Sequence, residues 1–142
     1  MKPAEIVLIE DNVADVLLVQ LALEESGISH SLKRYESGAD AVVALCESTG
    51  EDVPHPDAIL LDLNTPRTDG FEALASLRHS PRLSGVPIAI LTSSRAKGDK
   101  RRAEIQGTRY IEKPSQLDEF LTLIGQAVKE MLDPPTDGAG QA

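Results

Sequence analysis

Short apolar runs alternate with longer polar-and-apolar segments along the chain. Short apolar runs occur at four places: EIVLI at 5–9, DAILL at 57–61, VPIAIL at 86–91 and TRYI at 108–111. A fifth, weaker run, HSLKRY at 30–35, is amphipathic. Runs that are apolar at consecutive positions are typical of strands buried on both faces of a parallel sheet. The pattern therefore predicts five strands.

Segments with helical spacing separate and follow these runs. They cover residues 13–26, 41–48, 71–78, 97–106 and 117–132. The segment at 97–106 is the weakest, because its only apolar residues are Ala103 and Ile105. Strand and helix thus alternate five times, which predicts an α/β fold with a parallel sheet between helices.

The first helical segment carries the clearest apolar stripe. Its turns are set by Val13, Leu17, Leu21 and Glu24, and the stripe is widened by Val16, Leu18 and Leu23. Capping residues predict where the helices begin and end. Asn12, Ser37 and Ser115 are the expected first caps of their helices, and Gly27 is the expected end of the first helix.

Length and composition fit one domain. The chain has 142 residues, of which 41% are hydrophobic and 26% charged, as in ordinary globular proteins. We expect this domain to span residues 1–132 and the segment 133–142, which opens Asp-Pro-Pro, to be a disordered tail. The N-terminal apolar run is too short for a signal peptide or a membrane helix, so we expect a cytoplasmic protein without a membrane partner.

Charge and cysteine usage exclude several classes of function. The net charge of −9 argues against a nucleic-acid partner, which would need a positive field. Four aromatic residues and no Trp leave little for base stacking. Cys46 alone permits no internal disulfide and fits a reducing compartment, and its helical position predicts a buried structural thiol.

Polar residues stand where the strong strands end, and in an open parallel sheet these ends share one edge. The residues are Glu10, Asp11, Asp62, Asn64, Thr92 and Lys113. Carboxylates brought this close repel each other unless a cation neutralises them, and Mg²⁺ prefers such oxygen ligands. A metal-bound carboxylate beside a lysine and a hydroxyl also suits an acceptor for a phosphoryl group.

These motifs resemble the receiver domain of two-component response regulators, the CheY-like fold. The resemblance covers about residues 4–132 and rests on IEDN at 9–12, LLDLNTPRTDG at 60–70, ILTSS at 90–94 and YIEKP at 110–114. It implies a doubly wound (βα)5 sandwich whose five-stranded parallel sheet has the order 2-1-3-4-5. The motifs look most similar to stand-alone regulators, including those that serve phytochrome-type histidine kinases.

The resemblance implies a role for each matching residue. Asp62 would accept the phosphoryl group from a partner histidine kinase. Asp11 and Asp62 would ligate Mg²⁺, with help from Glu10 and from the backbone carbonyl of Asn64. Thr92 would hydrogen-bond the phosphoryl group, Lys113 would pair with it, and Tyr110 would turn inward as a switch.

The resemblance also makes predictions about the surrounding loops. The peptide bond between Lys113 and Pro114 would be cis, and Pro66 and Gly70 would shape the loop after Asp62. Two residues depart from the family pattern, since Thr65 and Ser115 stand where larger apolar residues are common. Thr65 therefore leaves the rate of dephosphorylation open.

Other readings of the same residues compete with this one. Glu10 and Asp11 could cap a turn, and Tyr110 could be an ordinary half-buried strand residue. An enzyme working through an aspartyl phosphate, such as a small phosphatase, would need a general acid two residues after Asp62, where Asn64 cannot protonate a leaving group. The third interpretation is a binding module with an inactive site. The chain retains the full set of polar residues, which argues against this interpretation: Glu10, Asp11, Asp62, Thr92 and Lys113. We expect no enzyme beyond slow self-catalysed dephosphorylation.

A basic cluster marks the expected output surface. Its residues are Arg95, Lys97, Lys100, Arg101 and Arg102. Such a cluster is either a solvated face or, in so acidic a chain, a docking surface for an acidic partner. We expect the helix at 97–106, the strand at 108–111 and the last helix to bind a downstream protein or a second copy. His30, His55 and His79 share no spacing and are expected at the surface.

Overall fold

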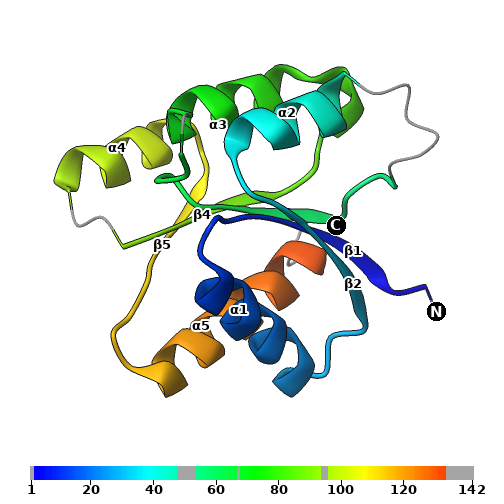
Figure 1. Ribbon diagram of the computed structural model, residues 1–142, viewed down its shortest axis with the longest axis vertical. Helices are drawn as coiled ribbons and strands as arrows, with labels where there is room; N and C mark the ends of the chain where they lie inside the picture. The colour runs from blue at the N-terminus through cyan, green and yellow to red at the C-terminus, as the bar shows by residue number, and fades with distance from the viewer. Residues whose placement is uncertain (1, 48–53, 67, 94–95, 134–142) are drawn as a thin grey trace, which may run out of the picture.

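A computed structural model describes residues 2–47, 54–66, 68–93 and 96–133, and these form a five-stranded parallel sheet with five α-helices (Figure 1). The strands are β1 Ala4–Ile9, β2 His30–Tyr35, β3 Ala58–Leu61, β4 Ile88–Thr92 and β5 Arg109–Glu112. The helices are α1 Val13–Glu25, α2 Gly38–Cys46, α3 Gly70–His79, α4 Lys97–Ile105 and α5 Leu117–Leu132. The sheet order is β2-β1-β3-β4-β5, which confirms the predicted fold class.

Helices cover both faces of the sheet. α1 and α5 lie on one face, and α2, α3 and α4 lie on the other (Figure 1). Successive strand residues point to opposite faces, so β3 contributes Leu60 to one core cluster and Ile59 and Leu61 to the other. The central strands are therefore apolar at every position because each position faces a layer of helices.

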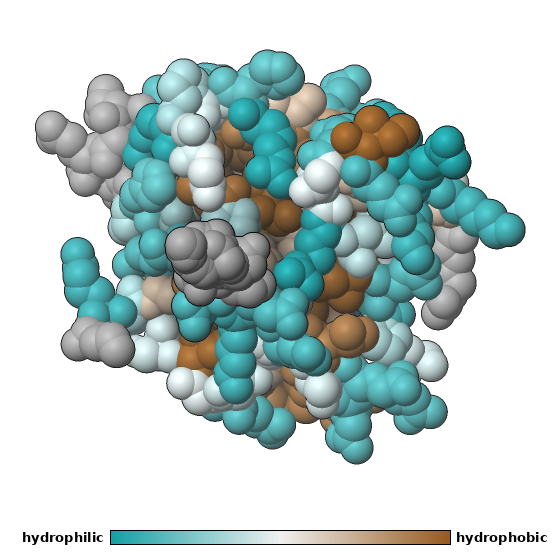
Figure 2. All heavy atoms as spheres, turned by 180° about the vertical axis from the view of Figure 1, so that it is seen from behind, coloured by the Kyte–Doolittle hydropathy of each residue, from teal (hydrophilic) through white to brown (hydrophobic). Residues whose placement is uncertain are grey.

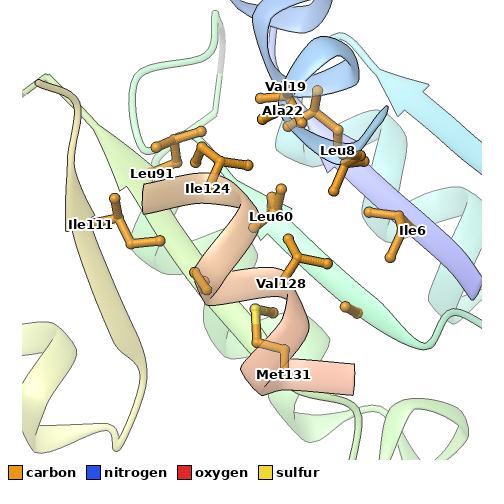
Figure 3. Close-up of a cluster of buried hydrophobic side chains, with 14 of the residues drawn as sticks. Ile6, Leu8, Val19, Ala22, Leu60, Leu91, Ile111, Ile124, Val128 and Met131 are labelled. Atoms are coloured by element: carbon orange, nitrogen blue, oxygen red, sulfur yellow. The ribbon is translucent and has the colours of Figure 1, made fainter. Parts of the chain in front are cut away.

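The core beneath α1 and α5 illustrates this packing. Figure 3 shows Ile124 and Val128 of α5 lying against Leu60 of β3, and Val19 of α1 beside Leu8 of β1. All five side chains are fully buried. Residues far apart in the sequence thus share one core.

The buried face of α1 differs from the predicted stripe. Val13 and Leu17 are 61% and 59% exposed, whereas Val19, Ala22 and Leu23 are buried. The prediction was right for Leu23, Val16 and Leu18, which belong to the core or pack against it, and wrong for Val13 and Leu17. The reason is that α1 is apolar on most of its circumference. Periodicity alone could not choose a face, and packing against α5 and the sheet chose it.

Most of the predicted caps are confirmed. The side chain of Asn12 accepts from the backbone N–H of Asp15 at 3.1 Å, and that of Ser37 accepts from Asp40 at 3.2 Å. Gly27 ends α1 with a φ of 72°, a conformation that glycine adopts without strain. Ser115 does not cap the last helix, since the capping residue is Gln116, which makes no side-chain cap bond.

α4 is held by few apolar contacts, as its sequence predicted. Ala103 is its only buried residue, and Ile105 is 76% exposed. The face of the molecule in Figure 2 is mostly hydrophilic, with hydrophobic side chains in small separate groups. Within the described residues, no helix is both long enough and apolar enough to cross a membrane.

Strand register brings the polar strand ends together. Ile9 of β1 is paired with Leu61 of β3, so Glu10 and Asp62 follow at the same level of the sheet. Further along, the backbone N–H of Lys113 donates to the carbonyl of Thr92 at 2.7 Å. The residues after β1, β3 and β5 therefore meet at one edge.

Candidate functional site

Three carboxylates meet at this edge of the sheet. Glu10, Asp11 and Asp62 each offer an oxygen within 4.8 Å of the others. Glu10 and Asp62 are buried, at 1% and 5% exposure, while Asp11 faces solvent. The structure therefore brings together the three acidic residues that the sequence singled out, and leaves one side of the cluster open.

Crowding changes the acidity of Glu10. Burial, and after it the hydrogen bond and negative charge of Asp62, raise the pKa of Glu10 from 4.5 to about 7, although Lys113 acts in the opposite direction. The carboxylate oxygen Glu10 Oε2 also accepts the backbone N–H of Asn12 at 3.2 Å. Burial and the neighbouring carboxylate of Asp62 thus both disfavour the ionised form of Glu10.

Lys113 supplies a positive charge to the cluster. Its Nζ lies 3.0 Å from Glu10 Oε1, 3.7 Å from Asp62 Oδ2 and 2.6 Å from Asp15 Oδ2. Burial acts to lower the pKa of Lys113, but the hydrogen bond with Asp15 and the charges of Asp62 and Glu10 outweigh it and raise the pKa above its usual value. Lys113 therefore stays protonated beside Asp62.

Asn64 links Asp62 to Thr92. The backbone N–H of Asn64 donates to Asp62 Oδ1 at 3.0 Å, and its side-chain amide donates to Thr92 Oγ1 at 3.3 Å. Thr92 is fully buried at the end of β4. One oxygen of Asp62 is thus fixed by the loop, and the other lies toward Lys113.

The loop after Asp62 is tightly packed. A Cβ on Gly70 would lie 2.6 Å from the backbone of Leu63, so only glycine fits there. Buried Thr65 accepts the backbone N–H of Gly38 at 3.2 Å through its hydroxyl. This contact explains a polar residue where the family pattern favours an apolar one.

The prediction of a cis bond before Pro114 is wrong. Every peptide bond between described residues is trans. The trans isomer is the intrinsically favoured one before proline. Lys113 still lies 3.7 Å from Asp62 with this bond in the trans form, so its approach to the carboxylate needs no cis bond.

Other predicted site residues lie around this centre. Tyr110 of β5 is half-buried and packs against the core cluster beneath α2 and α3. Lys97, Lys100, Arg101 and Arg102 lie in α4, and Arg95 is outside the described residues. Cys46 is half-buried rather than buried.

Two contributors were missed by the sequence reasoning. Asp15 forms the shortest ion pair of Lys113, and Arg34 of β2 donates to the backbone carbonyls of Glu10 and Asp11 at 2.9 and 3.0 Å. The sequence signal for Asp15 was its place in the first turn of the helix that begins beside the acidic pair. Nothing in the sequence indicated a role for Arg34, because only the pairing of β2 with β1 brings it to this edge of the sheet.

The donor set suits a hard divalent cation. It consists of carboxylate oxygens, which Mg²⁺ and Mn²⁺ accept, and it contains no histidine or thiolate. Burial, and after it Asp62, raises the pKa of Glu10, and a cation bound beside these carboxylates would favour the ionised form. The residues present therefore fit such an ion.

Comparison with known proteins identifies relatives of this site and fold. Residues 6–125 match the family model of the response regulator receiver domain. Response regulator Rcp1 of Synechocystis sp. is 36% identical over 125 residues, which span 86% of this chain and 84% of Rcp1.

Solved structures agree with this match. The phosphorylated cyanobacterial phytochrome response regulator RcpA superposes with a TM-score of 0.85 at 32% identity, over 95% of this chain and 98% of that one. The Mn²⁺-bound form of Rcp1 gives a TM-score of 0.83 at 33% identity, over 94% of this chain and 98% of that one. The sheet order, the acidic cluster with its lysine and the matched residues together show that this chain belongs to the response regulator receiver domain family, the phosphate-accepting domains of two-component signalling.

Proposed function

We propose that the chain is a phosphorylation switch whose Asp62 accepts a phosphoryl group from a histidine kinase. The position of Asp62 carries the proposal. Its carboxylate is 5% exposed, one oxygen accepts the N–H of Asn64, and the other lies 3.7 Å from Lys113 Nζ. A carboxylate held between a fixed donor and an ammonium is oriented to attack phosphorus.

The transfer conserves charge and atoms. An oxygen of Asp62 attacks phosphorus, the bond from phosphorus to the imidazole nitrogen of the kinase breaks, and the nitrogen keeps the electron pair. Lys113 and the hydroxyl of Thr92 donate to the oxygens of the transferred group. Hydrolysis of the product by water is slow and self-catalysed, so the chain is an acceptor rather than an enzyme.

The acidic cluster would hold Mg²⁺. Glu10, Asp11 and Asp62 offer carboxylate oxygens, and Asn64 would add its backbone carbonyl. The bound ion would neutralise the negative charge that develops on the transferring group. The Mn²⁺-bound structure of Rcp1, a relative, supports this assignment.

The output of the switch would pass through Thr92 and Tyr110. Thr92 follows the new negative charge, and the half-buried ring of Tyr110 on the neighbouring strand moves into the space that Thr92 leaves. α4 lies next to these strands and has one buried residue, so it costs little to shift. We assign phosphate-dependent binding of a protein partner or a second copy to α4, β5 and α5.

Partner and location follow from the relatives and the composition. RcpA is described as a phytochrome response regulator, which supports a phytochrome-type histidine kinase as the donor. The single free thiol, Cys46, supports a reducing compartment such as the cytoplasm.

A small phosphodonor tests the acceptor assignment. Acetyl phosphate with Mg²⁺ should add one acid-labile phosphoryl group to the full chain, detected by intact mass. Asp62→Asn and Asp11→Ala should each abolish the addition while the circular dichroism spectrum stays unchanged, and excess chelator should do the same. Asp69→Asn changes a carboxylate that caps α3 outside the cluster and serves as control. Full phosphorylation of Asp62→Asn would overturn the assignment.

The output surface has its own test. The double variant Arg101→Glu, Arg102→Glu should be phosphorylated like the wild type by acetyl phosphate but lose phosphate-dependent, salt-sensitive association. Unchanged association would place the output surface elsewhere. Normal acceptance from acetyl phosphate with lost acceptance from the kinase would assign the patch to kinase docking.

A further inference from the structure

The ammonium of Lys113 lies closer to Asp15 than to the carboxylate it is expected to serve. Nζ is 2.6 Å from Asp15 Oδ2 and 3.7 Å from Asp62 Oδ2. The lysine side chain is 13% exposed and that of Asp15 is 24% exposed, so solvent screens the pair only in part. Without phosphate, the site therefore directs its positive charge partly away from Asp62.

Asp15 stands outside the acidic cluster. The carboxylates close enough together to share a metal ion are those of Glu10, Asp11 and Asp62. Asp15 has no role in the phosphoryl transfer proposed above. Asp15 is in the first turn of α1, where its backbone N–H is bound by the side chain of Asn12. This cap fixes the start of α1 and with it the carboxylate that faces Lys113.

Phosphorylation changes the competition for the ammonium. A phosphoryl group on Asp62 brings about 1.5 to 2 negative charges and three acceptor oxygens. An ammonium is a compact charge on a flexible stem, and a shift of Lys113 from Asp15 toward these oxygens would lengthen its 2.6 Å contact with Asp15. Asp15 and the phosphoryl group therefore compete for the charge of Lys113.

We propose, resting on the function proposed above, that Asp15 is a positioning residue that competes with the phosphoryl group for Lys113. It holds the lysine toward α1 in the resting site and weakens the binding of a phosphoryl group at Asp62. Asp15 thereby sets how readily the switch returns to its resting state.

Beryllofluoride, a stable mimic of a phosphoryl group on a carboxylate, measures this competition. The full chain with saturating Mg²⁺ is titrated with beryllofluoride and followed by NMR. Asp15→Asn should bind the mimic roughly threefold tighter than the wild type, the size expected for loss of one partly exposed ion pair. Asp15→Glu restores the charge and should return the affinity toward that of the wild type.

Asp40→Asn is a matched control. Asp40 occupies the same helical position in α2 as Asp15 does in α1, with its N–H bound by the capping side chain of Ser37, but its carboxylate is exposed. Its variant should bind the mimic like the wild type. Thermal unfolding of each variant checks that the fold is retained.

The outcomes separate the two proposals. Equal or weaker binding by Asp15→Asn, with binding by the wild type intact, would overturn the role of Asp15 alone. The same tightening in Asp40→Asn would assign the effect to helix charge and also overturn it. A wild type that binds no beryllofluoride in the presence of Mg²⁺ would overturn the proposed function, and this inference with it.

Discussion

Glu10 is a buried carboxylate whose pKa is raised to about 7, chiefly by burial and then by Asp62. The folded chain therefore holds a proton on Glu10 at pH values where the unfolded chain, with its ordinary pKa near 4.5, has released it. The folded state binds more protons in this window, so stability falls as pH rises through it. At neutral pH, Glu10 of the metal-free chain is therefore only partly ionised, and a bound cation would favour its ionised form.

The predicted fall of stability with rising pH gives a test of the role of Glu10. In chelator, the free energy of unfolding of the wild type should fall between about pH 4.5 and 7, by at most ~3 kcal/mol. Urea unfolding at pH 5, 6 and 7 measures the fall. Glu10→Gln cannot ionise and should flatten it, whereas Glu25→Gln, exposed at the end of α1, should not. Equal slopes in wild type and Glu10→Gln would contradict the assignment.

The stability lost when a threonine hydroxyl is removed should also depend on burial, and Thr65 can be compared with Thr68. Its hydroxyl accepts the N–H of Gly38 at 3.2 Å in a buried contact, whereas Thr68 accepts the N–H of Ala39 at 3.2 Å near solvent. Thr65→Val keeps the shape but leaves a buried donor unpaired, and should cost ~1–3 kcal/mol of unfolding free energy. Thr68→Val, where water can replace the hydroxyl, should cost clearly less. Guanidinium unfolding compares the two, and equal losses would refute the distinction.

At the scale of elements, α4 is the helix with the weakest attachment. Ala103 is its only buried residue, and the guanidinium of Arg102 lies 3.9 Å from the centre of the Phe71 ring of α3. A cation over an aromatic face is an attractive contact. Arg102 therefore ties a loosely packed helix to the element that follows the loop of Asp62.

Removing this contact should loosen α4 alone. Arg102→Ala should speed amide hydrogen exchange in 97–105 by an amount that matches loss of ~0.5–1 kcal/mol, with the central strands unchanged. Arg101→Ala is the neighbouring control, because Arg101 is exposed and makes no such ring contact in the described structure. Exchange that is faster in both variants, or in neither, would show that the ring contact does not hold α4.

At the scale of the whole molecule, two core clusters share one sheet. Leu60 faces the cluster beneath α1 and α5, and Leu61 faces the cluster beneath α2 and α3, and both are fully buried. Because neighbouring residues of β3 belong to different clusters, loss of either cluster removes one face of the same strand. The two layers should therefore unfold together.

Truncation on each face tests this coupling. Leu60→Ala and Leu61→Ala should each cost ~2–5 kcal/mol, the range for a large aliphatic side chain removed from a core. Far-ultraviolet circular dichroism and tyrosine fluorescence should report one coincident transition in both variants. Separate transitions for the two probes would show that the layers are independent.

Much of the fold was predictable because its signals are local. Consecutive apolar residues in β3 and β4 and helical spacing in α5 appear within single segments, and α5 was predicted with its observed bounds, Leu117–Leu132. The exposed stripe of α1, including Val13 and Leu17, was not predictable, since α1 offers apolar residues on several faces. Ser115 failed as a cap because Gln116, and not Ser115, directly precedes the first helical residue, Leu117.

The sequence alone was enough to predict the α/β fold class and the polar residues at the strand ends, including Glu10, Asp62 and Lys113. Both follow from the order of residues along the chain, since parallel strands place their carboxyl ends at one edge. Two contacts became known only from the folded structure: Lys113 pairs most closely with Asp15, and Arg34 donates to the backbone carbonyls of Glu10 and Asp11. These contacts depend on burial and on distances between residues remote in sequence, which no local pattern specifies.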